Sequence, residues 1–101
     1  MKVLWAQEAL NDRTAIWDYL AERNLLAAAE LDSLFSEAAA RLAEYPLMGV
    51  SGKIIGTREL LPHEHYRLVY EVDEEAGIVR IMTLIHTARC WPPVSPDSPQ
   101  S

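Results

Sequence analysis

Two alternating segments near the C-terminal end of this chain constrain its fold more than any other feature. Residues 63–73 and 78–86 alternate in polarity, and a short acidic turn ending in Gly77 joins them. This arrangement predicts a β-hairpin. If Asp73 lies opposite Ile78, side chains alternate between two faces with a period of two. The face expected to point into the core then carries Tyr66, Leu68, Tyr70, Val72, Val79, Ile81, Thr83 and Ile85.

The opposite face of this hairpin is the first candidate for a functional surface. It carries two histidines and two arginines on a half-apolar background, and a purely structural hairpin needs no such cluster. In the assumed register, His65 and His86 face each other across the strands, about 5 Å apart at Cβ. A slip of the register by one residue would scramble this sorting. The full set is His65, Arg67, Val69, Glu71, Arg80, Met82, Leu84 and His86.

The first half of the chain predicts a short strand at residues 2–5 followed by two helices. Residues 7 to about 23 and 25–45 both repeat apolar side chains at helical spacing. Asn24 suits the turn between them, either as a left-handed residue after the first helix or as the N-cap of the second. Pro46 ends the second helix. The side of the first helix expected to face away from the core carries Asp12, Asp18 and Glu22.

The remaining segments complete a single α+β domain. Residues 47–56 predict a loop, a short strand follows at 57–61, and a turn at 62–64 leads into the hairpin. The predicted order is β-α-α-β-β-β, a small, mostly antiparallel sheet with a helical hairpin packed on one face. A chain of 101 residues suits one domain, which we place at residues 1–91. Residues 92–101 are rich in proline and serine and predict a disordered tail.

Composition indicates a cytoplasmic protein with an uneven distribution of charge. Cys90 is the single cysteine, so no disulfide framework is expected, and no apolar run near the start is long enough for a signal peptide or a membrane span. The formal net charge of −6 makes the whole chain a poor binder of polyanions, although the sheet could be locally positive. The second half of the chain supplies five cations, Lys53, Arg58, Arg67, Arg80 and Arg89.

Six short sequence motifs occur in the order of the predicted elements. They are Ile16-Trp-Asp-Tyr-Leu-Ala, the alanine run at 27–29, Arg41-Leu-Ala-Glu-Tyr-Pro-Leu-Met-Gly, Gly56-Thr-Arg-Glu-Leu, Tyr66-Arg-Leu-Val-Tyr and Ile85-His-Thr-Ala-Arg. Together with the predicted order of elements, they resemble the RelE/ParE superfamily of bacterial toxin–antitoxin toxins. The resemblance runs from residue 1 to about Trp91. Two positions depart from the usual sequence pattern of the family, because Leu25 replaces a proline and Val50 replaces a basic residue.

This resemblance implies the toxin of a type II toxin–antitoxin module. Such a toxin forms a hetero-oligomer with a cognate antitoxin, whose flexible C-terminal segment wraps and neutralises it. ParE-like members poison DNA gyrase, whereas RelE-like members are metal-independent ribonucleases that cut mRNA on the ribosome. The motif that begins at Ile16 resembles ParE-like members more closely, and a pI of about 4.9 does not favour docking on a ribosome.

We therefore expect a gyrase poison, with the RelE-like nuclease as the alternative. A third reading, compatible with the missing cation at Val50, is an inactive adaptor that only binds the antitoxin. A nuclease needs proton-transfer groups and a cation for the developing charge. The resemblance assigns these roles to Arg67 and His86, with His65 beside them; otherwise these side chains make surface ion pairs or cap strand ends.

Cofactors and metals are not expected. His63, His65 and His86 could together suggest zinc, but no carboxylate or thiolate obviously completes the site. The residues expected to contact the target or the antitoxin are Lys53, Arg58, Val69, Arg80, Met82, Leu84, Arg89 and Trp91.

Overall fold

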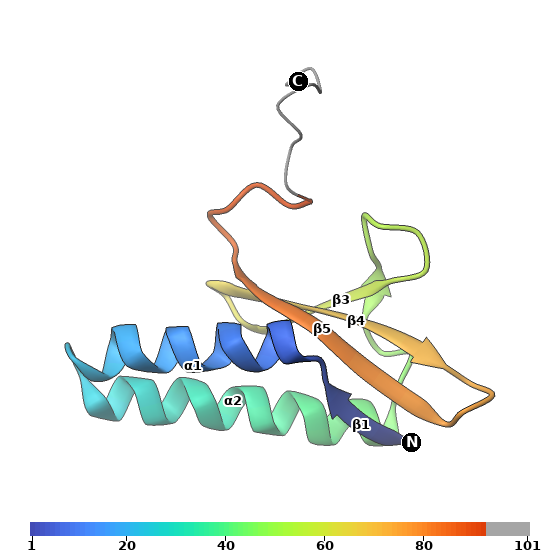
Figure 1. The fold of residues 1–101 in the computed structure, drawn as a ribbon, viewed down its shortest axis with the longest axis horizontal. Coiled ribbons are helices and arrows are strands. Elements are labelled where there is room, and N and C mark those ends of the chain that lie inside the picture. Colours follow the sequence, from blue (N-terminus) through green and yellow to red (C-terminus); the bar gives the residue numbers. More distant parts are fainter. Residues whose placement is uncertain (93–101) are drawn as a thin grey trace.

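The computed structural model describes residues 1–92, which form one mixed sheet with two long helices lying side by side along one of its faces (Figure 1). In chain order, the elements are β1 (Lys2–Trp5), α1 (Gln7–Ala21), α2 (Leu25–Glu44), β2 (Val50–Ser51), β3 (Arg58–His63), β4 (Tyr66–Asp73) and β5 (Ile78–His86). The strand order across the sheet is β1-β5-β4-β3-β2, and only β1 and β5 pair in parallel.

This architecture confirms the predicted α+β class and the helical hairpin on one face of a mostly antiparallel sheet. The short strand β2 is an addition, because it lies within the segment predicted as a loop. Strand β3 continues through Pro62 to His63, where a turn was expected. No helix within residues 1–92 is both long and apolar enough to cross a membrane. Apart from Pro92, the segment expected to be a disordered tail lies outside the described residues.

A capping residue at its turn and one apolar stripe that packs on the sheet stabilise the helical hairpin. Asn24 has an extended backbone, with φ of −159°, and its side chain accepts a hydrogen bond from the Ala27 amide at 3.0 Å. Of the two predicted roles for Asn24, the structure therefore shows the N-cap of α2. The core that joins the helices to the sheet contains Ala9, Leu31, Phe35, Ala38, Leu42, Leu68, Tyr70, Val79, Ile81 and Leu84.

The pairing of β4 with β5 follows the predicted register only near the hairpin turn. Asp73 lies opposite Ile78, and the pairs continue in step to Tyr70 opposite Ile81. There the register shifts by one residue, so that Val69 pairs with Thr83 and Tyr66 pairs with His86. The extra residue, Met82, makes a β-bulge, and the predicted sorting of faces is wrong beyond it.

Asp12 of α1 accepts hydrogen bonds from the edge of β5 where this bulge occurs. Strand β1 stops at Trp5 opposite Ile81, and the chain then turns into α1. Beyond that point, one carboxylate oxygen of Asp12 accepts hydrogen bonds from the Thr83 hydroxyl at 2.6 Å and the Leu84 amide at 3.1 Å. A buried strand edge needs such partners for its polar groups. The expectation that Asp12 faces away from the core is therefore wrong.

Candidate functional site

The open face of the sheet, on the side away from the helices, is organised around the carboxylate of Glu59 in β3. Its Oε1 pairs with Nε of Arg67 at 3.1 Å. Its Oε2 accepts hydrogen bonds from the Trp91 indole at 3.1 Å and from the Lys53 amide at 3.0 Å. We call these four residues the Glu59 cluster. It joins three of the residues predicted from the sequence as separate candidates.

Glu59 itself is not among the candidates that the sequence identifies. Its side chain is 10% exposed and that of Arg67 is 19% exposed, so the pair is largely removed from solvent. A shielded ion pair resists separation, because removing one partner leaves a desolvated charge behind. A phosphate that bound Arg67 would have to compete with Glu59. No local sequence signal marks Glu59, because strand pairing sets it opposite Val69 and within reach of Arg67.

Three histidines gather with Tyr66 at the far end of the β4–β5 hairpin. The rings of His65 and His86 are stacked, with centroids 5.7 Å apart and planes within 8°. The His63 ring lies 5.3 Å from that of His65, and Tyr66 meets His86 edge-on at 5.2 Å. The predicted approach of His65 and His86 is thus confirmed. It does not arise from the predicted register, however, because Tyr66 lies opposite His86 and His65 lies in the turn.

Backbone contacts orient two of these imidazoles. Nδ1 of His63 accepts a hydrogen bond from the His65 amide at 3.1 Å, and Nδ1 of His86 accepts one from the Ala88 amide at 3.0 Å. An imidazole nitrogen that accepts cannot carry the proton, so the neutral ring holds it on Nε2. These two histidines can therefore donate from Nε2. Within residues 1–92, no group of three or more metal-ligating side chains is arranged to hold a metal ion.

A hollow of about 430 Å³ lies beside this histidine cluster, between α1 and the end of the hairpin. Burial, together with the neighbouring Tyr19, raises the pKa of the Tyr66 hydroxyl above its ordinary value, so this phenol stays protonated over the physiological range. The lining combines aromatic, acidic and basic groups that could hold a polar ligand. The residues around the hollow are Asp12, Ala15, Ile16, Tyr19, Tyr66, Leu84, His86 and Arg89.

The β-bulge places Arg67 and His86 on opposite faces of the sheet. The ring of Tyr66 meets Phe35 of α2, with centroids 5.8 Å apart, so Tyr66 faces the helices. His86 pairs with Tyr66 and contacts its ring, whereas Arg67 follows Tyr66 in the strand and faces the open side. The structure therefore does not bring together the two residues that the resemblance assigned to nuclease chemistry.

The apolar residues expected on the open face are also less available than predicted. Leu84 belongs to the core between sheet and helices and is 4% exposed, because the bulge turns it inward. Val69 remains on the open face but is 1% exposed, and Met82 is half-buried at the bulge. The expectation of an exposed apolar surface is therefore wrong at Val69 and Leu84, and Met82 is only partly exposed.

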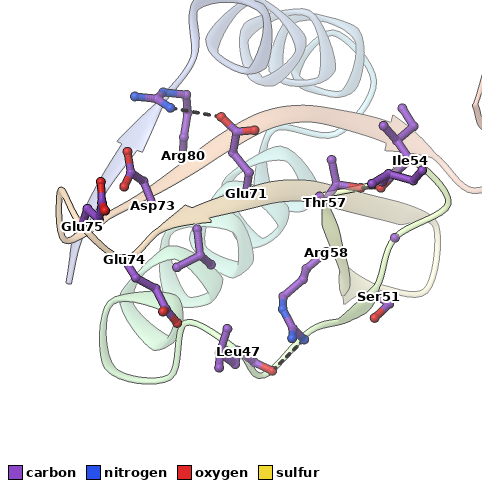
Figure 2. Close-up of a pocket in the computed structure, with 14 residues that line it drawn as sticks. Leu47, Ser51, Ile54, Thr57, Arg58, Glu71, Asp73, Glu74, Glu75 and Arg80 are labelled. Atoms are coloured by element: carbon purple, nitrogen blue, oxygen red, sulfur yellow. Dashed lines mark hydrogen bonds and ion pairs between the residues drawn. The ribbon is translucent and has the colours of Figure 1, made fainter.

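The two remaining arginines of the predicted binding set line a larger cleft of about 810 Å³ at the other end of the sheet (Figure 2). Arg58 donates to the backbone oxygens of Leu47 at 3.2 Å and Gly49 at 2.7 Å. Arg80 pairs with Glu71 at 3.0 Å. Both guanidinium groups are thus held by partners within the chain. The cleft separates the residue 47–57 segment from the acidic tip of the β4–β5 hairpin.

Comparisons with a family model and with individual proteins both find similarity to toxins. Residues 3–91 match the family described as the ParE toxin of the type II toxin–antitoxin system parDE. Toxin RelE2 of Caulobacter vibrioides is 38% identical over 88 residues, which cover 87% of this chain and 97% of that protein. Y4kP of Sinorhizobium fredii, named as a candidate toxin, is 33% identical over 94 residues, covering 92% and 95% of the two chains.

Solved structures of two toxin–antitoxin systems share the fold. A chain of the chromosomal ParDE system from P. aeruginosa matches with a TM-score of 0.73 at 18% identity, over 85% of this chain and 95% of that one. A chain of the RelBE2 complex from Mycobacterium tuberculosis matches with a TM-score of 0.54 at 27% identity, over 84% and 95%.

Proposed function

This chain belongs to the ParE toxin family and is the toxin of a type II toxin–antitoxin system, and we propose that it arrests growth by binding and poisoning DNA gyrase. The observation that carries this proposal is the separation of Arg67 from His86 by the β-bulge. Metal-independent cleavage of RNA needs a proton-transfer group and a charge-stabilising cation at the same phosphate. A protein that acts by binding another protein has no such requirement.

The state of Arg67 supports the same proposal. Its guanidinium is paired with Glu59 in a largely buried contact, so its positive charge is already balanced. Arg80 forms a more exposed ion pair with Glu71, and Arg58 donates to backbone carbonyl oxygens. A nuclease that docks on ribosomal RNA would be expected to present free cations, because phosphate contacts dominate such binding. The net charge of −6 also opposes approach to a polyanion.

An antitoxin completes the proposal. The solved structures that share this fold include toxin–antitoxin complexes, and one of them is the intact RelBE complex of E. coli. We propose that a cognate antitoxin forms a hetero-oligomer with this chain in the cytoplasm and blocks its action. Co-expression with the product of the neighbouring reading frame, followed by pull-down, tests this step; recovery of the chain as a free, non-toxic monomer would argue against it.

Purified DNA gyrase provides the direct test of the target. Relaxed plasmid, ATP and gyrase are incubated with increasing amounts of the protein, and supercoiled product is followed on agarose gels. We expect inhibition at micromolar protein and relief of inhibition when the protein is first mixed with its antitoxin. Induced cells should accumulate DNA damage and filament, while protein synthesis continues initially. Full supercoiling activity at micromolar protein would refute the gyrase proposal.

The RelE-like ribonuclease is the second candidate, favoured by the 38% identity to a protein named RelE2 and by His86, whose Nδ1 accepts from Ala88 so that the neutral ring carries its proton on Nε2. This mechanism predicts that His86→Ala lowers mRNA cleavage about a hundredfold or more, without any need for a divalent metal. Toe-printing on translating ribosomes would reveal cuts in the A site. Arrest that survives both His86→Ala and Arg67→Ala excludes the nuclease, and a chain that neither cuts mRNA nor inhibits gyrase is an antitoxin-binding adaptor.

A further inference from the structure

Exposed apolar side chains concentrate in one loop of this protein. Within residues 1–92, twelve large apolar residues are markedly exposed, and five of them fall between residues 47 and 56. Ile55 is 100% exposed and Val50 is 70% exposed. The neighbouring Ile54 and Ile55 form an exposed apolar patch, and such a patch on a small domain usually marks an interaction site. The five residues are Leu47, Met48, Val50, Ile54 and Ile55.

The loop that carries these residues is firmly held at its tip. Thr57 bonds twice to the carbonyl oxygen of Ile54, through its hydroxyl at 2.6 Å and its amide at 3.1 Å. Gly52 donates to the Thr57 carbonyl at 2.8 Å, and the Lys53 amide bonds to Glu59. Gly56, with φ of +86°, completes the turn in a conformation that favours glycine. The apolar tip, formed by Ile54 and Ile55, is therefore presented in a defined shape.

The base of the loop is equally constrained. The buried hydroxyl of Tyr70 accepts a hydrogen bond from the Gly49 amide at 2.9 Å, while Arg58 holds the Gly49 carbonyl. A loop whose backbone is already ordered loses less conformational entropy when a partner covers it. The loop thus resembles a preformed knob, which suits insertion into an existing hollow of a folded partner.

The cleft beside the apolar tip identifies the kind of partner. It opens where β3 begins opposite Tyr70 while β4 continues to Asp73. Figure 2 shows the carboxylates of the hairpin tip across the cleft from Ile54. Four carboxylates and two guanidinium groups line the cleft, a formal charge of −2. The acidic rim, Asp73, Glu74 and Glu75, therefore repels nucleic acid and attracts a cationic surface.

We propose that the apolar tip and the acidic rim together form the surface by which this toxin engages DNA gyrase, an inference that rests on the proposed function. An enzyme that acts on DNA exposes cationic surface to hold the phosphates. The acidic rim complements that charge, and the apolar tip fills an apolar hollow beside it. A flexible antitoxin segment, by contrast, brings no preformed hollow into which the apolar tip could insert.

Substitutions at exposed positions test the surface without disturbing the core. Ile55→Ser removes the fully exposed side chain of the tip, and Glu74→Lys with Glu75→Lys reverses the rim. Matched controls are Leu26→Ser, at a position 70% exposed on α2, and Glu30→Lys with Glu37→Lys on the same helix. Binding to purified gyrase is measured by biolayer interferometry, with supercoiling inhibition and thermal melting in parallel.

Ile55→Ser should weaken gyrase binding about tenfold or more, as expected when a central apolar contact is truncated. Rim reversal should slow association about tenfold at low salt, because charge complementarity governs the on-rate. The control variants should bind as the wild type does, and all variants should melt at nearly the same temperature.

Three results would overturn the inference. If wild-type protein fails to bind gyrase, both the proposed function and this surface are wrong. If wild-type protein binds and Ile55→Ser binds equally well, the function stands and the surface is wrong. If Ile55→Ser loses affinity for the antitoxin and keeps affinity for gyrase, the surface belongs to the antitoxin.

Discussion

Replacing Asp12 with alanine should destabilise this toxin strongly, although Asp12 lies on a helix surface that the sequence marks as polar. One carboxylate oxygen accepts hydrogen bonds from both the Thr83 hydroxyl and the Leu84 amide. Thr83 is 8% exposed and Leu84 is 4% exposed, so both donors belong to residues that are largely shielded from solvent. The substitution therefore leaves two shielded donors without a partner.

The expected size of the effect follows from these two donors. A buried donor left without a partner costs about 1–3 kcal/mol, and the Thr83 hydroxyl can rotate to limit its share. Alanine returns about 0.5 kcal/mol through its better helix propensity. A net loss of about 2–4 kcal/mol results, against a total stability of about 5–15 kcal/mol for a domain of this kind. The melting temperature should fall by roughly 10–25 °C.

Asparagine at position 12 separates the geometry of the acceptor from its charge. Both hydrogen bonds end on the same oxygen, so an amide oxygen in that place can accept both. Only the charge-assisted part is lost, about 1 kcal/mol. Asp18→Ala, at an exposed position on the same helix, should change stability by less than about 0.5 kcal/mol.

Urea unfolding followed by circular dichroism measures all three variants at neutral pH. The expected order of stability is wild type and Asp18→Ala, then Asp12→Asn, then Asp12→Ala. Equal stability of Asp12→Ala and Asp18→Ala would show that the contact to β5 contributes nothing. Equal losses for Asp12→Asn and Asp12→Ala would show that the charge matters and the shared acceptor does not.

The remaining predictions concern the buried tyrosine beneath the apolar loop. Tyr70→Phe leaves the Gly49 amide without its acceptor and should cost about 1–3 kcal/mol in urea unfolding. Gly49→Ala would place a Cβ atom 2.7 Å from the Tyr70 hydroxyl oxygen and 2.8 Å from the Glu59 carbonyl oxygen, and it should lower the free energy of unfolding by about 1–3 kcal/mol. In the double variant with Tyr70→Phe, the loss of stability should be smaller than the sum of the two single losses, because the substitutions affect the same contact. Strictly additive losses would contradict that contact. Burial raises the pKa of Tyr70 and of Tyr66 above the ordinary value of 10.0, so these tyrosines ionise first in the unfolded chain. The free energy of unfolding should therefore fall as the pH rises above 10. Tyr70→Phe should make this fall less steep, and an unchanged pH dependence would contradict the role of Tyr70.

Local signals in the sequence determined much of this fold. The alternation and the acidic turn predicted the hairpin, and the register assumed for it holds from Asp73 opposite Ile78 to Tyr70 opposite Ile81. Asn24 marked the turn between the helices, and it caps α2. Capping, turn chemistry and periodicity act over a few residues, so a sequence displays them directly.

The β-bulge was decided by tertiary structure. Between Met82 and Ile85, the strand carries apolar side chains at both odd and even positions, so periodicity does not select a register. Asp12, which lies 71 positions from Thr83, meets the edge of β5 where β1 has ended and satisfies the displaced backbone. The bulge turns Leu84 into the core and separates His86 from Arg67.

The Glu59 cluster also could not be predicted from the sequence. The sequence displayed Lys53, Arg67 and Trp91 as separate candidates, and they meet because β3 pairs with β4 and the segment after β5 returns to the open face. Periodicity shows which side of a strand a residue occupies. Which distant side chains share that side depends on strand order and register, and these are properties of the folded sheet.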